Sequence, residues 1–310
     1  MPKSIVFLLP LRLLATMSSD SSPFFPPELE QKIFETAAYL HPETRSSLVL
    51  VSHRVYEWID RMKYTDVTPN GGQWSCTDRH LLRAIKSNSK PGSFFHRHVR
   101  HVFIADTPIN DIQKILSVCT GIQDLMISLH VESITPTIAA LRPRRLSLFW
   151  LYILGYTNPR QPMFSFLTHF HMLDFLSVTR STVPVPSFLA QLPILTHFAA
   201  FWNPPVGDGF PAVAREILAA CEALQVFVLH PPWEGRLRSL PSNDDVRVVY
   251  MHLGREYHHL WDGWLAQTRG GIDFWARADA FVEKKRHKEI QPASRCWIEP
   301  ADSIPEFDSF

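Results

Sequence analysis

Glycine is scarce in this sequence, with 12 residues in 310, against the roughly 7% that is usual in proteins. The glycine-rich loops that bind phosphates do not occur, neither as a P-loop nor as a dinucleotide fingerprint. A GxSxG nucleophile elbow and an HExxH zinc motif are also missing. Because no activating constellation is visible, we expect a protein that is not an enzyme and that needs no cofactor.

Cysteine pairs, a charge excess and metal-ligand spacings are lacking as well. The four cysteines lie far apart, unlike those of disulfide-stapled domains or zinc sites, which favours a reducing compartment, the cytoplasm or the nucleus. The 31 basic residues nearly cancel the 30 acidic ones, so no global field attracts nucleic acid or a membrane surface. Histidine is plentiful at 15 residues, but its clusters lack further ligands at fixed spacing, so we expect no metal site.

No hydrophobic run is long enough to span a membrane, for which about 18 apolar residues are needed. The apolar run Ile5–Leu11 resembles a signal peptide, but Pro10 and Arg12 interrupt it. We interpret residues 1–22 as a disordered or wrongly included leader, of which residues 1–16 need not belong to the mature protein.

Two amphipathic helices are predicted next. The first, over residues 26–39, starts at prolines and carries acidic residues in its first turn. The second, over residues 43–64, has apolar residues at alternating steps of three and four. Because about 40 residues bury little on their own, both helices must share apolar surface with another partner or act as a cap on the following domain.

The residues of these helices resemble the F-box. Pro27-Glu28-Leu29, then Ile33-Phe34, then Leu48-Val49-Leu50-Val51-Ser52-His53-Arg54 and Trp58 follow its pattern over residues 25–65. The segment is also similar to the F-box-like opening of proteins from mushroom-forming fungi. The resemblance implies docking on a Skp-type adaptor of a cullin-RING ubiquitin ligase, with the following docking residues: Pro27, Leu29, Ile33, Phe34, Leu48 and Val51.

A short apolar signature recurs seven times from Val99 onward, at steps of about 21 to 30 residues. The signatures are VRHVFI from Val99, IQDLMI from Ile122, PRRLSL from Pro143, LDFLSV from Leu173, LTHFAA from Leu195, LQVFVL from Leu224 and VRVVYM from Val246. Helix-like stretches lie between them, so parallel strands joined by crossovers are expected. This part of the chain resembles degenerate leucine-rich repeats, although an ordinary α/β sheet remains an alternative.

The predicted fold class is therefore α/β, with an F-box-like helical module, an irregular leucine-rich-repeat-like solenoid and a helical C-terminal cap. The expected segments are the leader at 1–22, the F-box-like module at 23–66, a connector at 67–97, the repeat-like body at 98–255 and the cap and tail at 256–310. The run Lys284–Lys288 is either a nuclear import signal or, as we expect, the solvated end of a helix.

Two functions fit this organisation best, and an enzyme whose site is assembled from residues distant in sequence is a third alternative. The first is a substrate receptor, whose helices bind the adaptor and whose body binds an unknown target protein. The second is an interaction solenoid that recruits no ligase. Neither function requires nucleic acid, a membrane or a catalytic residue.

Overall fold

The computed structural model describes residues 25–69, 76–128, 135–149, 158–176, 185–202, 210–231, 243–253 and 271–299, together with Trp264 and Asp302. The chain divides into two compact units, Met1–Ile59 and Asp60–Phe310. Each unit is described by itself.

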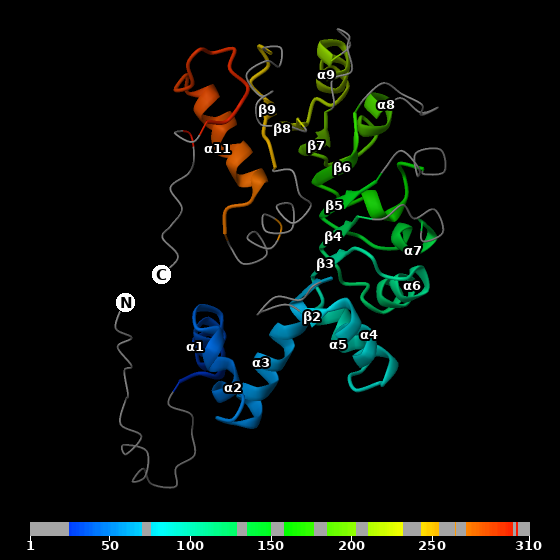
Figure 1. Ribbon diagram of the computed structural model, residues 1–310, viewed down its shortest axis with the longest axis vertical. Helices are drawn as coiled ribbons and strands as arrows, with labels where there is room; N and C mark the ends of the chain where they lie inside the picture. The colour runs from blue at the N-terminus through cyan, green and yellow to red at the C-terminus, as the bar shows by residue number, and fades with distance from the viewer. Residues whose placement is uncertain are drawn as a thin grey trace. The chain divides into compact units, whose positions relative to one another are not determined.

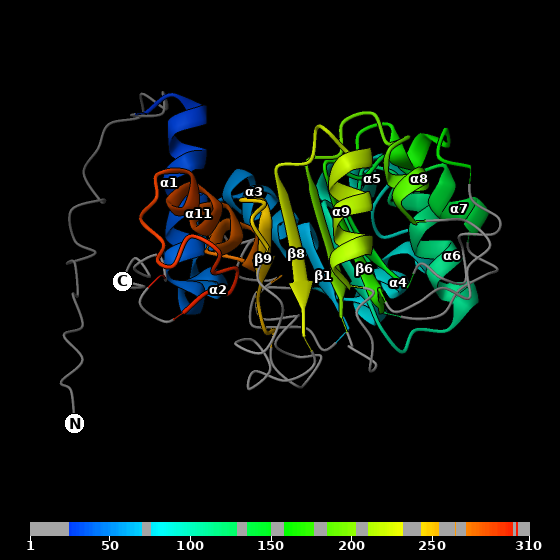
Figure 2. The ribbon, with the colours of Figure 1, turned by 90° about the horizontal axis from the view of Figure 1, so that it is seen from above.

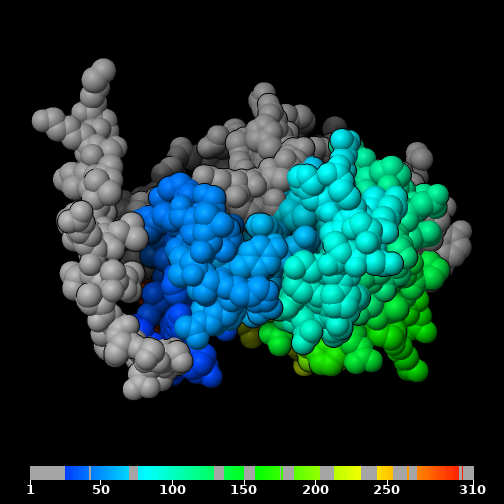
Figure 3. All heavy atoms as spheres, turned by 90° about the horizontal axis from the view of Figure 1, so that it is seen from below, coloured from blue at the N-terminus to red at the C-terminus, as the bar shows by residue number. Residues whose placement is uncertain are grey.

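Unit 1 is helical, and its described residues form the continuous blue surface in Figure 3. Its elements are α1 (Pro27–Leu40), the 3₁₀ turn η2 (Pro42–Thr44), α2 (Arg45–Leu48) and the start of α3 (His53–Thr65). The expected single helix over residues 43–64 is wrong, because the chain turns between α2 and α3. The hydroxyl of Ser52 accepts a hydrogen bond from the Val55 amide (3.3 Å), so Ser52 caps a new helix at this point.

Unit 2 is an α/β unit built on one parallel sheet of nine described strands. The strands are β1 (Asp66–Thr68), β2 (Cys76–Thr77), β3 (His101–Ile104), β4 (Asp124–Ile127), β5 (Arg145–Leu148), β6 (His169–Phe175), β7 (His197–Phe201), β8 (Val226–His230) and β9 (Val248–Tyr250). From β3 to β9 each strand lies beside the one that follows it in the chain, and β1 and β2 extend the sheet beyond β3. The expected α/β class and the expected parallel strands are therefore confirmed.

Helices or 3₁₀ turns connect most of the strands, and a last helix follows β9. They are α4 (Asp78–Lys86), α5 (Gly92–His98), α6 (Ile109–Val118), α7 (Thr135–Ala139), η5 (Pro162–Phe164), α8 (Val185–Leu189), α9 (Phe210–Ala220) and α11 (Phe274–Arg286). Residues 67–97, expected as a connector, supply the end of β1, β2, α4 and α5. Between β5 and β6, where the sequence also indicates a helix over residues 162–170, the structure has only η5, because His169 already begins β6. Of the expected helical cap and tail, residues 256–270 lie outside the described residues except for Trp264.

The register of the sheet corrects two of the repeat signatures. His169 of β6 pairs with Arg145 and with His197 on the two neighbouring strands. The segment equivalent to the other signatures is thus LTHFHM from Leu167, which matches LTHFAA from Leu195, and not LDFLSV from Leu173. Val248 pairs with Phe227, so the signature predicted from Val246 is one residue out of register, and its equivalent segment starts at Asp245.

Alternate residues of each strand build two separate cores. The outer face packs under α4 to α9, where Phe170, Phe198 and Phe227 form a row with ring centroids 5.8 and 5.5 Å apart. The inner face packs against α11, which lies on the opposite side of the curved sheet (Figures 1 and 2). Beyond β9, the Tyr250 amide donates to the Cys296 carbonyl (2.6 Å), so residues near Trp297 cover this edge.

Candidate functional site

Two features of the structure are candidates for function: an apolar surface on unit 1 and a polar cluster on the inner face of unit 2. The first contains the residues predicted from the sequence to dock an adaptor. The second was not predicted.

Helix α1 carries apolar residues on two opposite faces. Phe34 and Ala38 face the interior of unit 1, where Ala38 is fully buried and the Phe34 ring lies 6.3 Å from that of Trp58. Leu29, Ile33 and Leu40 recur on the other face, as their spacing predicts, and their exposed fractions are 54%, 52% and 52%. The described part of the chain therefore leaves the outer stripe of α1 in solvent.

The turn between α2 and α3 also exposes apolar residues. Leu50 and Val51 are exposed by 84% and 58%, while Leu48 is half-buried. The Leu50 amide donates to Ser47 and the Val51 amide to Leu48, both at 3.1 Å. These hydrogen bonds satisfy the backbone of the turn, so its two apolar side chains are held outward on an ordered loop.

Polar contacts on the other side of α1 fix the helices of unit 1. Arg54 of α3 forms an ion pair with Glu30 of α1, and its guanidinium lies 5.8 Å from the Trp58 ring centroid. Arg45 donates to the Ala38 carbonyl (3.0 Å) near the end of α1. Since these contacts lie away from the outer stripe, that stripe is not needed to hold the helices together.

Of the six predicted docking residues, four are exposed: Pro27, Leu29, Ile33 and Val51. Leu48 is half-buried at the border of the surface, and Phe34 packs inward on Trp58. Leu40 and Leu50 were not in the predicted set, although both lie on the exposed surface. The periodicity of α1 already indicated Leu40, whereas nothing in the sequence distinguished Leu50 from the buried residues near it.

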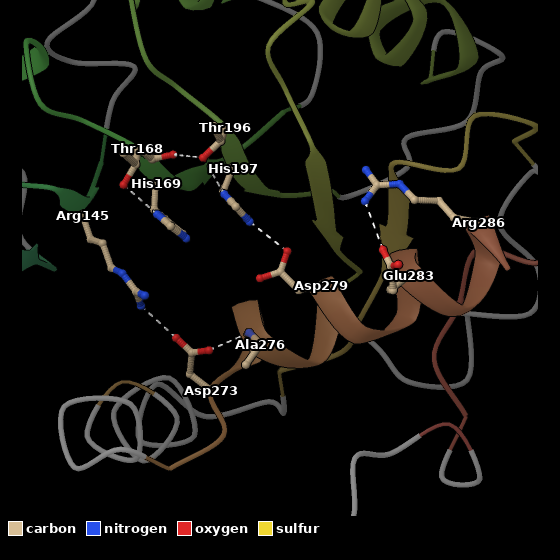
Figure 4. Close-up of polar contacts among 10 residues, drawn as sticks. All are labelled: Arg145, Thr168, His169, Thr196, His197, Asp273, Ala276, Asp279, Glu283 and Arg286. Carbon is tan, nitrogen blue, oxygen red and sulfur yellow. Dashed lines mark hydrogen bonds and ion pairs between the residues drawn. The ribbon is translucent and has the colours of Figure 1, made fainter.

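The polar cluster in unit 2 lies where α11 meets the sheet (Figure 4). The guanidinium of Arg145 pairs with Asp273 (3.1 Å), whose other oxygen accepts from the Ala276 amide (2.7 Å) and caps α11. His197 Nε2 lies 2.9 Å from the Asp279 carboxylate. The cluster thus joins β5 and β7 to the first two turns of α11.

Histidines line the sheet side of this contact. The His169 and His197 rings are stacked, and Trp275 of α11 meets both of them edge-on. Burial lowers the pKa of His169 to about 2, with His197 and Arg145 adding to the shift. Burial also raises the pKa of Asp273. The hydrogen bond from the Ala276 amide and the positive charge of Arg145 act in the opposite direction and reduce this rise. The inner face therefore holds an uncharged histidine at neutral pH.

A small cavity of about 20 Å³ adjoins the cluster. Arg145, Ser147, His171 and Asp273 contribute its polar residues, and Met126 and Trp275 are among its apolar ones. Its volume is enough for one water molecule. Within the described ranges no group of three or more histidine, cysteine or acidic side chains is placed to hold a metal ion.

Two further predictions bear on these surfaces. The basic run at Lys284–Lys288 is not simply a solvated helix end, because Lys285 is buried and its ammonium lies 3.4 Å from the Asp245 carbonyl. Among the described helices, none is both long and apolar enough to cross a bilayer.

Comparison with known proteins adds no relative: no protein-family model matches the chain, and no curated protein matches it significantly.

Proposed function

We propose that this chain is a substrate-recognition subunit of a cullin-RING ubiquitin ligase. In this proposal the outer stripe of α1, with the turn after α2, binds a Skp-type adaptor, and unit 2 binds a target protein. The ubiquitin chemistry takes place on other subunits, so no residue of this chain is catalytic. The observation that carries the proposal is the exposed stripe Leu29, Ile33 and Leu40 on a helix whose opposite face is already packed.

This arrangement supports docking by a helix in a groove. A helix that needs only one apolar face for its own unit gains nothing in stability from a second apolar face exposed to water. Residues at i, i+4 and i+11 are the anchors that such a groove accepts. Fully burying one leucine or isoleucine contributes about 1.5–3 kcal/mol, so three anchors offset part of the cost of association.

We further propose that unit 2 is a leucine-rich-repeat-like solenoid. Three features support this: strands in chain order from β3 to β9, one helical connection after most of them, and the repeated LTHF of β6 and β7. In stacked repeats each unit contacts mainly its neighbours, which gives this strand order. The target then binds to unit 2 outside the part of the inner face that α11 covers.

The proposal places the protein in the cytoplasm, the nucleus or both. All four cysteines are free and buried, which accords with a reducing compartment. A receptor without its own active site also accords with the sequence, in which no catalytic motif was found.

The test is co-expression of the full chain with a Skp-type adaptor, followed by affinity capture and measurement of the dissociation constant. We expect the wild type to form a stoichiometric complex. The double variant Leu29→Ala/Ile33→Ala should weaken binding at least 100-fold, because two anchors lose most of their buried area. Its circular dichroism spectrum and unfolding midpoint should stay close to those of the wild type.

A matched control comes from unit 2, where Ile109 and Ile194 are exposed by 37% and 40%. The variant Ile109→Ala/Ile194→Ala removes similar apolar area and should leave adaptor binding unchanged. Absence of binding by the wild type would remove the ligase function and leave the interaction solenoid. Equal loss in both variants would show that the effect is not specific to α1.

A further inference from the structure

Two buried histidines face each other beneath α11, outside the surface proposed for the adaptor. His171 of β6 and His230 of β8 are exposed by 2% and 0%, and their ring centroids lie 5.2 Å apart. Phe201 of β7 packs against both rings, and its ring centroid lies 5.7 Å from that of His171 and 5.4 Å from that of His230. Phe274, the first residue of α11, covers them from the helix side, with its ring centroid 5.3 Å from that of His171 and 5.2 Å from that of His230.

Hydrogen bonding fixes the state of this pair. The Nδ1 atom of His230 lies 2.8 Å from the Met251 carbonyl, which can only accept, so Nδ1 carries the proton. The Nε2 atom of His230 is then an unprotonated acceptor. It is buried without a hydrogen-bond partner among the described residues, as is Nε2 of His171. Both rings therefore sit as neutral imidazoles in a box formed with Phe201 and Phe274, and His171 also lines the small cavity beside Arg145 and Asp273.

The charged groups around the box do not favour protonation. Burial lowers the pKa of His171 well below its ordinary value, and His230 adds to the shift. Burial lowers the pKa of His230 to about 3; the Met251 hydrogen bond opposes this, while His252 and Arg277 add to it. On the cavity side, Asp273 is already paired with Arg145.

Other groups on the same face are also engaged. His197 of β7 is paired with Asp279 of α11, and His169 of β6 is packed against Trp275. The amino end of α11 itself carries the positive end of the helix dipole beside Phe274. A proton on either buried imidazole would thus meet cations and a positive helix end from the elements packed around it.

We propose that His171 and His230 form an acid-sensitive switch that holds α11 on the inner face at neutral pH and releases the helix when both imidazoles bind protons. Release exposes the apolar residues that α11 covers, among them Val228, Val249 and Met251. Acid therefore opens an interaction surface that is closed at neutral pH.

Geometry limits the effect to α11. The residues beneath this helix form a core of their own, separate from the core between the sheet and α4 to α9. The outer core contains no buried histidine among the described residues, so acid leaves its packing unchanged. The helix can then leave the inner face while the sheet and the outer helices stay folded.

Proton linkage determines the direction in which pH shifts the release of α11. A histidine with a lowered pKa in the closed form stabilises that form fully above its ordinary pKa of about 6.5, and the stabilisation is lost as pH falls below that value. Each histidine then shifts the equilibrium toward release about fivefold between pH 6.5 and 5.5, and about tenfold per pH unit further below 6.5. His171, His230 and His169 together give about 170-fold between pH 6.5 and 5.5.

The experiment is hydrogen–deuterium exchange of the full chain between pH 7.5 and 5.0, corrected for the intrinsic pH dependence of amide exchange. We expect the protection of α11 to fall about 170-fold between pH 6.5 and 5.5, while that of α6 stays the same. In His171→Leu/His230→Leu the fall should shrink to about fivefold, from His169 alone. The control His287→Leu, at an exposed histidine after α11, should behave as the wild type.

Two further measurements keep the test decisive if the double variant does not fold. The single variant His230→Leu should give a fall of about 30-fold over the same pH range. NMR of the wild-type C2 protons should show both histidines neutral until α11 opens. The proposal would be overturned if α11 and α6 lost their protection together as the pH falls. It would also be overturned if the protection of α11 did not depend on pH. An unchanged pH dependence in both leucine variants would do the same.

Discussion

The imidazole rings of His169 and His197 are stacked on neighbouring strands, with their centroids 4.0 Å apart and their planes 9° from parallel. They occupy the same register position of β6 and β7. Trp275 of α11 lies edge-on to both rings, at 5.2 and 5.6 Å. One tryptophan thus joins two neighbouring strands of the sheet to the helix that covers them.

Trp275→Ala should lower the free energy of unfolding by about 3–5 kcal/mol, because Trp275 is only 5% exposed and its removal leaves a cavity over the stacked histidines. Urea denaturation followed by circular dichroism measures this change. Trp275→Phe keeps an aromatic edge on both imidazoles and should lose less than half as much. A loss below 1 kcal/mol for the alanine variant would contradict the packing of Trp275.

Two valines in unit 1 give a matched test of which apolar residues are free for a partner. Val51 is 58% exposed in the turn before α3, and Val55 is fully buried one turn into the helix. We expect Val51→Ala to change the free energy of unfolding by less than about 0.5 kcal/mol, and Val55→Ala to lower it by about 1–3 kcal/mol. Equal effects in urea denaturation would show that Val51 is part of the interior.

Much of the fold could be predicted because it depends on local patterns. The apolar residues of the strands alternate and recur, and six of the seven signatures lie at strands of the sheet. The fourth signature was misplaced, since Leu173–Val178 is also apolar and periodicity alone cannot choose between overlapping runs. Only the pairing of His169 with Arg145 decides the register.

The inner-face cluster could not be predicted, because its residues come from distant parts of the sequence. Arg145 and Asp273 are joined only when α11 folds back over the sheet. The sequence indicated that His169 and His171 would share a face if they lay in a strand, but it gave no reason to bury them. The exposed stripe of unit 1 could be predicted as a periodic face, whereas its exposure depends on tertiary packing.

Replacing glycine by alanine should change the free energy of unfolding in opposite directions at Gly121 and at Gly92. At Gly121 an added Cβ atom would lie 1.9 Å from the His96 carbonyl oxygen and 2.8 Å from Arg100 Nη1, whereas at Gly92 it would meet no atom within 4 Å. Gly121→Ala should therefore lower the free energy of unfolding by more than about 1 kcal/mol. Gly92→Ala, in the first turn of α5, should raise it by about 0.4–1 kcal/mol. Thermal unfolding of the two variants, compared side by side, checks both signs.

Asp302 and Arg295 form an ion pair with two hydrogen bonds, of 2.6 and 3.0 Å, and their side chains are exposed by 10% and 8%. Burial acts to raise the pKa of Asp302, but the hydrogen bonds from Arg295 and the Glu299 amide outweigh it, so the pKa lies below its ordinary value. Asp302→Asn keeps the shape of the side chain and removes the charge. It should lower the free energy of unfolding at pH 7 by roughly 1–3 kcal/mol.

The pH dependence separates the charge of Asp302 from its packing. A carboxyl group with a lowered pKa stabilises the fold above its unfolded-state value of about 3.9, and this contribution is lost as pH falls through the folded-state pKa. The difference between wild type and Asp302→Asn should therefore be constant from pH 7 to about 5 and shrink below pH 4, as urea titrations at each pH can measure. Asp111→Asn, which breaks a more exposed pair with Lys86 (3.1 Å), should change the free energy by less than about 1 kcal/mol. A difference for Asp302→Asn that persists at pH 3 would show that the carboxylate charge is not what stabilises this contact.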